Sequence, residues 1–252
     1  MSNTPRRVHS VGNALRLLTV LAEHPDGLGV SDLATRLEVG KSTAHLLLST
    51  LAEHGFVERL EAGTYCLGIA AFEIGSAVPE SSRFGGPLTP PMRKLADLSG
   101  EAVSLAIHRG RDALIVQRFE SASILRAEIR IGTKMPVHSC GSGKVFLAEL
   151  PVEELDALFP SETLPAAAKN TFRQKSALSR QLAEVRRDGY ATIDEEYTDG
   201  VRGIATGVRN RRNEVVAALS VAGPIPRFEP SDWLQDLNST AEEMSTILVG
   251  RL

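Results

Sequence analysis

The sequence has few cysteines, few aromatic residues and no strong excess of either charge. Its two cysteines, Cys66 and Cys140, are too few for a disulfide framework or a cysteine-based zinc site, and they suit a reducing compartment. Aromatic residues make up 5% of the 252 residues, and the 28 lysines and arginines nearly balance the 31 acidic residues, for a net charge of −3. The overall charge therefore does not by itself indicate a nucleic-acid partner.

Long apolar segments are also missing from the sequence. No uninterrupted apolar stretch approaches the roughly 18 residues that span a bilayer, and residues 1–10 are polar, unlike a signal peptide. With 42% hydrophobic and 23% charged residues, the composition is typical of a soluble globular protein with one or two domains. We expect a cytoplasmic protein with no membrane partner, no cofactor and no metal site.

Three amphipathic helices are predicted near the N-terminus. Apolar residues recur at three- and four-residue spacing over residues 11–22. A short helix over residues 31–37 should follow, with Ser31 as a plausible N-cap. We expect Val39-Gly40 to form the next turn, where the glycine is free to take a positive φ, and residues 41–54 to form the third helix. This spacing favours a helix-turn-helix.

A short hairpin and a linker follow these helices. Residues 56–60 and 64–67 have the pattern of two strands around a tight loop, which completes a winged helix-turn-helix. Residues 68–78 predict a further helix, and residues 79–91 are rich in proline, glycine and serine, as a linker or domain boundary would be.

The remaining residues predict an α+β domain with a largely antiparallel sheet, because runs of strands are interrupted by helices without strict alternation. Strands are expected over 102–108, 113–119, 124–131, 190–193, 204–209 and 215–221, and helices over 92–99, 143–150, 152–159, 176–188 and 231–249. The predicted organisation is a DNA-binding domain over 1–68, a linker helix and hinge over 69–91, and a second domain over 92–252.

Short segments in a specific order, from residue 14 to residue 224, match one family pattern. They are Ala14-Leu15-Arg16-Leu17-Leu18, Lys41-Ser42-Thr43-Ala44-His45, Gly55-Phe56-Val57, Tyr65-Cys66-Leu67-Gly68, Pro136-Val137-His138, Gly143-Lys144, Leu147-Ala148, Gly189-Tyr190, Asp194-Glu195-Glu196-Tyr197, Gly200-Val201-Arg202 and residues 217–224. On these residues the chain resembles the IclR-type transcriptional regulators from end to end. The resemblance implies a GAF/profilin-like effector-binding domain, a homodimer or dimer of dimers, and small organic acids or aromatic compounds as effectors.

The start of the third helix should enter the major groove of double-stranded DNA. Lysine suits phosphate or guanine, and hydroxyl and imidazole groups donate to phosphates or base edges. Alternatively, the two hydroxyl residues only cap the helix and the histidine is solvated. The candidate DNA-binding residues there are Lys41, Ser42, Thr43, His45 and Leu46.

One of these residues departs from the family. Members often have arginine at the position of Leu46, which either touches a thymine methyl group or only packs. Arg59 and Thr64 on the wing, and Arg6 and Arg7 on the N-terminal arm, are secondary candidates. Residues 1–78 contain six basic and eight acidic residues, so the DNA face depends on local charge and on dimerisation over what we expect to be a palindromic operator.

The effector pocket is assigned mainly from the resemblance. Residues 139–144 fit neither a phosphate-binding loop nor a dinucleotide fingerprint. They form a glycine-rich turn at the start of a helix, which either favours an anion such as a carboxylate or is only a tight turn. The resemblance implies a lining of Ile124, Met135, Gly141, Ser142, Ile193, Val201, Gly203 and Ser220, to which we add Cys140 and Asp194.

Several alternatives remain open at the sequence level. The acidic run that begins at Asp194 is either part of the pocket or a solvated loop. Gly203 and Ala222, where relatives often have cysteine and serine, favour a larger or less polar effector. His138 and Cys140, two positions apart on one strand, would share a face and could form a base and a nucleophile, although no third catalytic member is evident.

The leading hypothesis is therefore a ligand-responsive transcription regulator, not an enzyme. A Cys140-dependent hydrolase with a helix-turn-helix and a ligand-free DNA-binding adaptor are the alternatives. Neither repression nor activation follows from the sequence.

Overall fold

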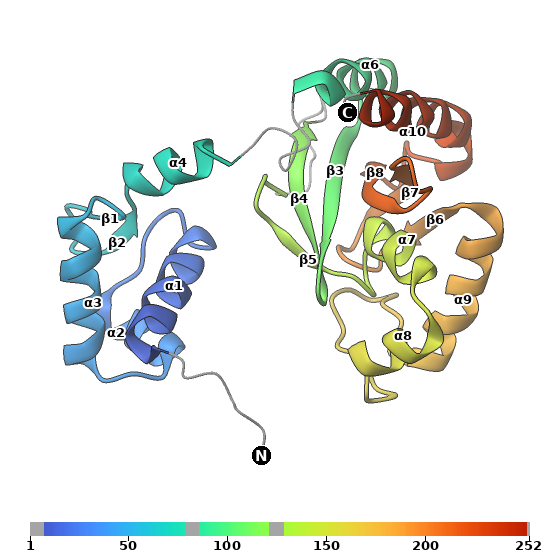
Figure 1. The fold of residues 1–252 in the computed structure, drawn as a ribbon. Coiled ribbons are helices and arrows are strands. Elements are labelled where there is room, and N and C mark those ends of the chain that lie inside the picture. Colours follow the sequence, from blue (N-terminus) through green and yellow to red (C-terminus); the bar gives the residue numbers. More distant parts are fainter. Residues whose placement is uncertain (1–7, 79–85, 121–128, 251–252) are drawn as a thin grey trace. The chain divides into compact units, whose positions relative to one another are not determined.

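The structure is a computed structural model that describes residues 8–78, 86–120 and 129–250. The chain divides into two compact units, residues 1–82 and 83–252 (Figure 1). Because each unit has its own hydrophobic core, the units are the two structural domains of the molecule.

The N-terminal unit is a small helical domain closed by a β-hairpin. Leucines at i, i+4 spacing bury one face each of the first two helices, which pack on the third helix around a shared core. The hairpin adds Val57 and Tyr65 to this core, and Tyr65 also bridges to Leu28 through backbone hydrogen bonds. The elements are α1 (His9–Ala22), α2 (Val30–Leu37), α3 (Lys41–Glu53), β1 (Val57–Arg59), β2 (Tyr65–Leu67) and α4 (Ile69–Ser76).

The turn between α2 and α3 differs from the expectation in two respects. The predicted N-cap Ser31 is wrong, because α2 begins at Val30 and the extended residue before it is Gly29. Gly40 has φ −65° and does not use its freedom to take a positive φ; the left-handed residue is Glu38, with φ 58°. The chain reverses at Glu38 because the peptide N–H groups just past the helix bond back to its last carbonyls, as at other helix C-termini.

The C-terminal unit contains one antiparallel sheet in the order β5-β4-β3-β8-β7-β6. Its strands are β3 (Ala102–Arg109), β4 (Asp112–Phe119), β5 (Lys134–Pro136), β6 (Tyr190–Asp194), β7 (Val201–Arg209) and β8 (Val215–Pro224). Its helices are η1 (Gly86–Leu88), α6 (Thr89–Ser99), α7 (Gly141–Glu149), α8 (Val152–Leu158), α9 (Lys175–Asp188), η2 (Pro230–Trp233) and α10 (Leu234–Val249).

Helices cover both faces of this sheet (Figure 1). One core packs α6 and α10 on one face, and a second core packs α7, α8 and α9 on the other. Alternation along β7 serves both cores: Ile204 and Val208 face the first, and Ala205 between them faces the second. This two-sided burial explains why the central strands lack a polar face.

Most predicted elements of the C-terminal unit are present, with shifted ends. Helix α6 begins at Thr89 rather than residue 92, because its two prolines occupy the first turn, where a missing N–H costs nothing. The strand expected over 124–131 lies mainly outside the described residues, and residues 129–131 are not in a strand. Instead, the short strand β5 pairs with β4.

Candidate functional site

The exposed face of α3 carries the five residues predicted to contact DNA. Lys41, Ser42, Thr43, His45 and Leu46 are all exposed, and Leu46 is 68% exposed. Residues 44 and 48 on the opposite face are completely buried and anchor the helix to the core. No side chain caps the start of α3, so the hydroxyls of residues 42 and 43 are not engaged as caps. The five side chains therefore form one surface at the beginning of the helix.

The wing adds one further basic residue. Arg59 at the end of β1 is exposed, and its guanidinium lies 6.0 Å from the centre of the Tyr65 ring. This contact holds the arginine over β2 without removing its charge from solvent. Arg6 and Arg7, the arm residues predicted to contact DNA, lie outside the described residues.

A narrow cavity lies in the C-terminal unit between the sheet and the start of α7. The sequence-predicted residues that line it are Met135, Cys140, Gly141, Ser142, Ile193, Val201, Gly203 and Ser220. Water-sized molecules have about 50 Å³ of space in it, which is room for a few waters. An aromatic acid would therefore require lining side chains to move.

Other lining residues were missed in the sequence. They come from strands β3, β4, β7 and β8, from the segment before β5 and from the loop after β6. Polar residues between buried apolar neighbours, such as Ser104 in β3, were the available signal, but only strand pairing shows that they meet. The missed residues are Ser104, Ile115, Arg118, Ile129, Tyr197, Thr198, Ile204 and Val221.

The glycine-rich turn at the start of α7 is a packing feature. A Cβ atom on Gly143 would lie 2.2 Å from the carbonyl oxygen of Val137, so glycine is required for the close approach of the two backbones. Gly141 and Ser142 begin α7 and line the cavity. The positive end of the α7 dipole therefore faces the cavity.

The structure does not place His138 and Cys140 on one strand face, where a base and a nucleophile were expected to meet. The expectation of a shared strand face is wrong, because β5 ends at Pro136 and residues 137–139 form a turn. Burial raises the pKa of the Cys140 thiol to about 12, so the thiol is protonated at neutral pH. His138 Nε2 donates to the carbonyl oxygen of Pro165 at 2.8 Å, which fixes the imidazole for a structural role.

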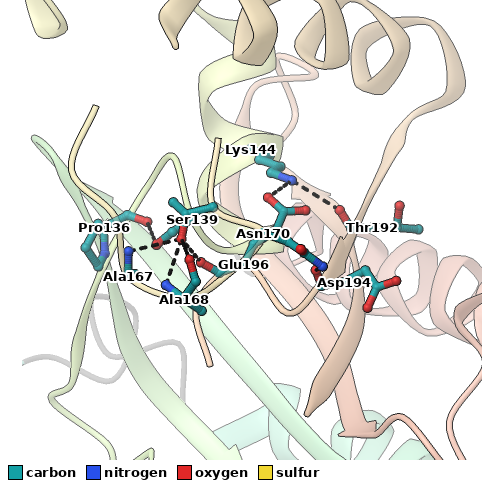
Figure 2. A network of polar contacts seen from close by, with 10 residues as sticks. Pro136, Ser139, Lys144, Ala167, Ala168, Asn170, Thr192, Asp194 and Glu196 are labelled. Atoms are coloured by element: carbon teal, nitrogen blue, oxygen red, sulfur yellow. Dashed lines mark hydrogen bonds and ion pairs between the residues drawn. The ribbon is translucent and has the colours of Figure 1, made fainter. Parts of the chain in front are cut away.

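Figure 2 shows a polar network that includes Glu196 of the loop that follows β6. Lys144 of α7 is completely buried and forms an ion pair with Glu196. Burial lowers the pKa of Lys144 and raises that of Glu196, whereas their contact opposes both changes. Lys144 Nζ also donates to the main-chain carbonyl oxygen of Thr192 at 3.3 Å. The side-chain amide of Asn170 donates to the main-chain carbonyl oxygen of Asp194 at 3.1 Å. The network holds this loop, whose next residues line the cavity.

Asp194, predicted to bind the effector, is not among the residues that line the cavity. Its carboxylate is 54% exposed and lies 3.3 Å from a guanidinium nitrogen of Arg202. Ile124 lies outside the described residues. Within the described ranges there is no cluster of three or more metal-ligand side chains and no helix long and apolar enough to cross a membrane.

A helix-turn-helix with a wing and an antiparallel sheet enclosing a small cavity define a DNA-binding protein with a sensor domain. Two family models match the chain. The IclR helix-turn-helix domain covers residues 10–61, and the C-terminal domain of the bacterial transcriptional regulator IclR covers residues 87–246. The chain therefore belongs to the IclR family of transcriptional regulators, which confirms the resemblance, the fold class and the function.

Named relatives agree with this assignment. The transcriptional repressor IclR of Escherichia coli K12 is 33% identical over 225 residues, or 88% of this chain and 82% of the relative. The HTH-type transcriptional regulator XynR of the same organism is 32% identical over 226 residues, or 89% and 90% of the two chains. These relatives are transcription regulators, not enzymes.

Solved structures show the same fold. A transcriptional regulator from Rhodococcus sp. RHA1 has a TM-score of 0.77 and 27% identity, and the match covers 96% of this chain and 98% of that one. An IclR homologue from Microbacterium hydrocarbonoxydans, solved in complex with 4-hydroxybenzoate, has a TM-score of 0.83 and 24% identity, with coverages of 95% and 98%.

Proposed function

We propose that this regulator binds a palindromic operator through α3 and releases or engages it when a small organic or aromatic acid occupies the cavity of its C-terminal unit. The DNA contacts would come from the exposed α3 residues 41, 42, 43, 45 and 46, with Arg59 and Arg7 on flanking phosphates. The observation that supports this most directly is the grouping of five exposed side chains at the start of α3, opposite a fully buried face.

The effector site would be the cavity at the start of α7. Eight of the ten residues predicted from sequence line it, and it combines an apolar surface with hydroxyl groups and a helix N-terminus. The Microbacterium homologue carries an aromatic acid, 4-hydroxybenzoate. We take the same chemical class, together with smaller carboxylic acids, as the effectors of this chain.

Dimerisation would use the apolar faces of α1 and α4. Val8, Val11 and Leu15 form an exposed stripe at helical spacing, with exposed fractions of 55–65%. No residue of α4 is buried, and Ile69 and Phe72 on it are 61% and 71% exposed. Such neighbouring apolar side chains mark an interaction surface, and a second copy of the chain is the partner that a palindromic operator requires.

The proposed domain boundaries are residues 1–68 for DNA binding, 69–91 for the linker helix and hinge, and 92–252 for effector binding and assembly. The name of one relative, the transcriptional repressor IclR, favours repression as the function of this chain. A regulator that binds DNA in a bacterium would be located in the cytoplasm. Helix α6 begins at Thr89, so the effector unit extends slightly into the proposed hinge.

Selection of bound duplexes from a random DNA pool, with purified protein at a fixed salt concentration, tests this function. We expect a palindromic site to be enriched, and Lys41→Gln to lower affinity for it about tenfold. Lys134→Gln, which removes an exposed lysine of β5, is the matched control and should leave affinity unchanged. If no sequence is enriched by the wild-type protein, the proposed function is wrong.

A further inference from the structure

Arg118 of β4 lies at the end of a polar row that crosses the floor of the cavity. In the sheet Arg118 is opposite Ser104 of β3, and Ser104 is opposite Ser220 of β8. All three residues line the cavity. The Arg118 side chain is only 5% exposed. A guanidinium that is this deeply buried needs a partner that satisfies its charge and its N–H groups.

No other residue that lines the cavity within the described ranges carries a charge. The remaining polar groups are hydroxyls, main-chain groups and the Cys140 thiol, which is neutral because burial raises its pKa to about 12. Among the described lining residues, no negative side chain therefore repels an anion, and the positive charge of Arg118 favours one.

A carboxylate already contacts this guanidinium. Arg118 Nε donates to one Glu120 carboxylate oxygen at 2.8 Å and Nη2 to the other at 3.4 Å, while Nη1 donates to Ser104 Oγ at 2.8 Å. Planar, two-point contact is the arrangement in which arginine binds carboxylates best. Glu120 does not line the cavity, and its side chain is 41% exposed. It can therefore turn into water at low cost, whereas Arg118 remains buried.

We propose that Arg118 and Ser104 form the carboxylate-binding subsite of the effector cavity, and that Glu120, from outside the lining, pairs with the Arg118 guanidinium as an internal competitor until an acid displaces it. This inference rests on the proposed function, in which an organic acid is the effector. The exchange adds little desolvation cost at Arg118, because this side chain is already buried before the ligand arrives and one carboxylate replaces another. The rest of the ligand would lie toward Met135 and Ile193.

The test compares acids with neutral analogues. Affinities of the full-length protein for benzoate, benzamide, 4-hydroxybenzoate and 4-hydroxybenzamide would be measured by calorimetry or by concentration-dependent thermal shift. We expect each acid to bind wild type at least tenfold more tightly than its amide. Arg118→Met should remove that preference, with a loss of acid affinity of about tenfold to hundredfold. Arg118→Lys, which keeps the charge in a compact form, should restore part of it.

Removing the internal competitor Glu120 should change acid affinity in the opposite direction. Glu120→Gln removes the internal carboxylate, so acid affinity should rise about threefold to tenfold while amide affinity is unchanged. A purely structural Arg118 would not produce this gain. Arg187→Met and Asp188→Asn, which break an exposed ion pair outside the cavity, are the matched controls and should change neither affinity.

An acid preference below twofold in wild type, or an undiminished preference in a folded Arg118→Met, would overturn the proposed subsite. A Glu120→Gln variant with unchanged or weaker acid binding would also overturn it. DNA selection by the same variants keeps the two proposals separate. If only the subsite is wrong, the protein without ligand still binds its operator. If the proposed function is wrong, the wild-type protein selects no operator.

Discussion

At the residue scale, the proposed binding of DNA by α3 depends on single side chains. The exposed start of this helix provides one lysine, two hydroxyls and a histidine, and the neighbouring Leu46 presents a large apolar side chain to solvent. Arginine at this position would add a phosphate or guanine contact. We therefore expect the affinity of each monomer for DNA to be modest, and a dimer would double the number of contacts.

Leu46→Arg is predicted to raise operator affinity about threefold to tenfold at 0.1 M salt. One added phosphate contact should also steepen the dependence of log affinity on log salt by about 0.9. Fluorescence anisotropy over a salt series measures both quantities. Leu98→Arg, at a leucine of α6 that is 58% exposed, is the matched control. Equal salt slopes for wild type and Leu46→Arg would show that position 46 does not face DNA.

His138 is predicted to make stability fall in mild acid. Burial, followed by the Arg111 and Lys144 charges, lowers the pKa of His138 below its ordinary value of 6.5, although its bond to Pro165 opposes this. Below pH 6.5 the unfolded chain therefore binds a proton that the folded chain does not, and the free energy of unfolding falls as pH falls from 6.5 toward the folded pKa. His138→Gln should flatten this dependence in urea unfolding between pH 7 and 5. A variant with the wild-type slope would contradict the assignment.

The cavity residues that could not be predicted from the sequence are those that strand pairing brings together from distant positions in the chain. Arg118 and Ser104 are 14 residues apart, and Ser220 is 116 residues beyond Ser104, so their row exists only in the folded sheet. The prediction that Asp194 lines the cavity was wrong for a related reason. Local alternation cannot tell whether the Asp194 carboxylate at the end of β6 faces the cavity or, as here, the half-buried Arg202.

At the scale of elements, periodicity was sufficient for most helices and strands, because each buries one face on a core. Boundaries depended on backbone details that periodicity does not contain. Prolines within the first turn moved the start of α6, and the left-handed Glu38 moved the turn before α3. Strand β5 has three residues, which is too short for an alternating pattern.

Helix α7 packs closely on the backbone of Val137 because residue 143 is glycine. This contact gives a prediction at the scale of the helix. Gly143→Ala should lower the free energy of unfolding of the C-terminal unit by at least about 2 kcal/mol, because the new methyl group would overlap the Val137 backbone. Gly12→Ala is the control: it lies inside α1 with no atom within 4 Å of the new Cβ. That change should raise stability by about 0.5–1 kcal/mol. Denaturant unfolding distinguishes them, and a tolerated Gly143→Ala would contradict the packing argument.

The whole molecule combines a DNA-binding unit with a sensor unit, and we propose that their coupling works through a dimer. The apolar surfaces of α1 and α4 are not used by the core of the N-terminal unit. Cooperation between two copies on a palindromic site would compensate for the small number of basic residues on each.

Phe72→Glu is predicted to weaken self-association at least tenfold, because a charge would be buried in an apolar interface. The fold should be unaffected, since the side chain is 71% exposed in the single chain. Sedimentation velocity over a concentration series measures the association. Val152→Glu, at a 63% exposed residue of α8, is the matched control. Wild-type association by Phe72→Glu would exclude α4 from the interface.

The central claim, that an acid in the C-terminal cavity controls DNA binding, is tested most directly by operator titrations with and without ligand. Fluorescence anisotropy on the selected palindrome at fixed salt, in the presence of 4-hydroxybenzoate, benzoate or short-chain carboxylates, gives the coupling between the two sites. We predict that at least one acid changes operator affinity about 5-fold to 150-fold and that its amide does not. Identical operator affinity with every acid would contradict the account.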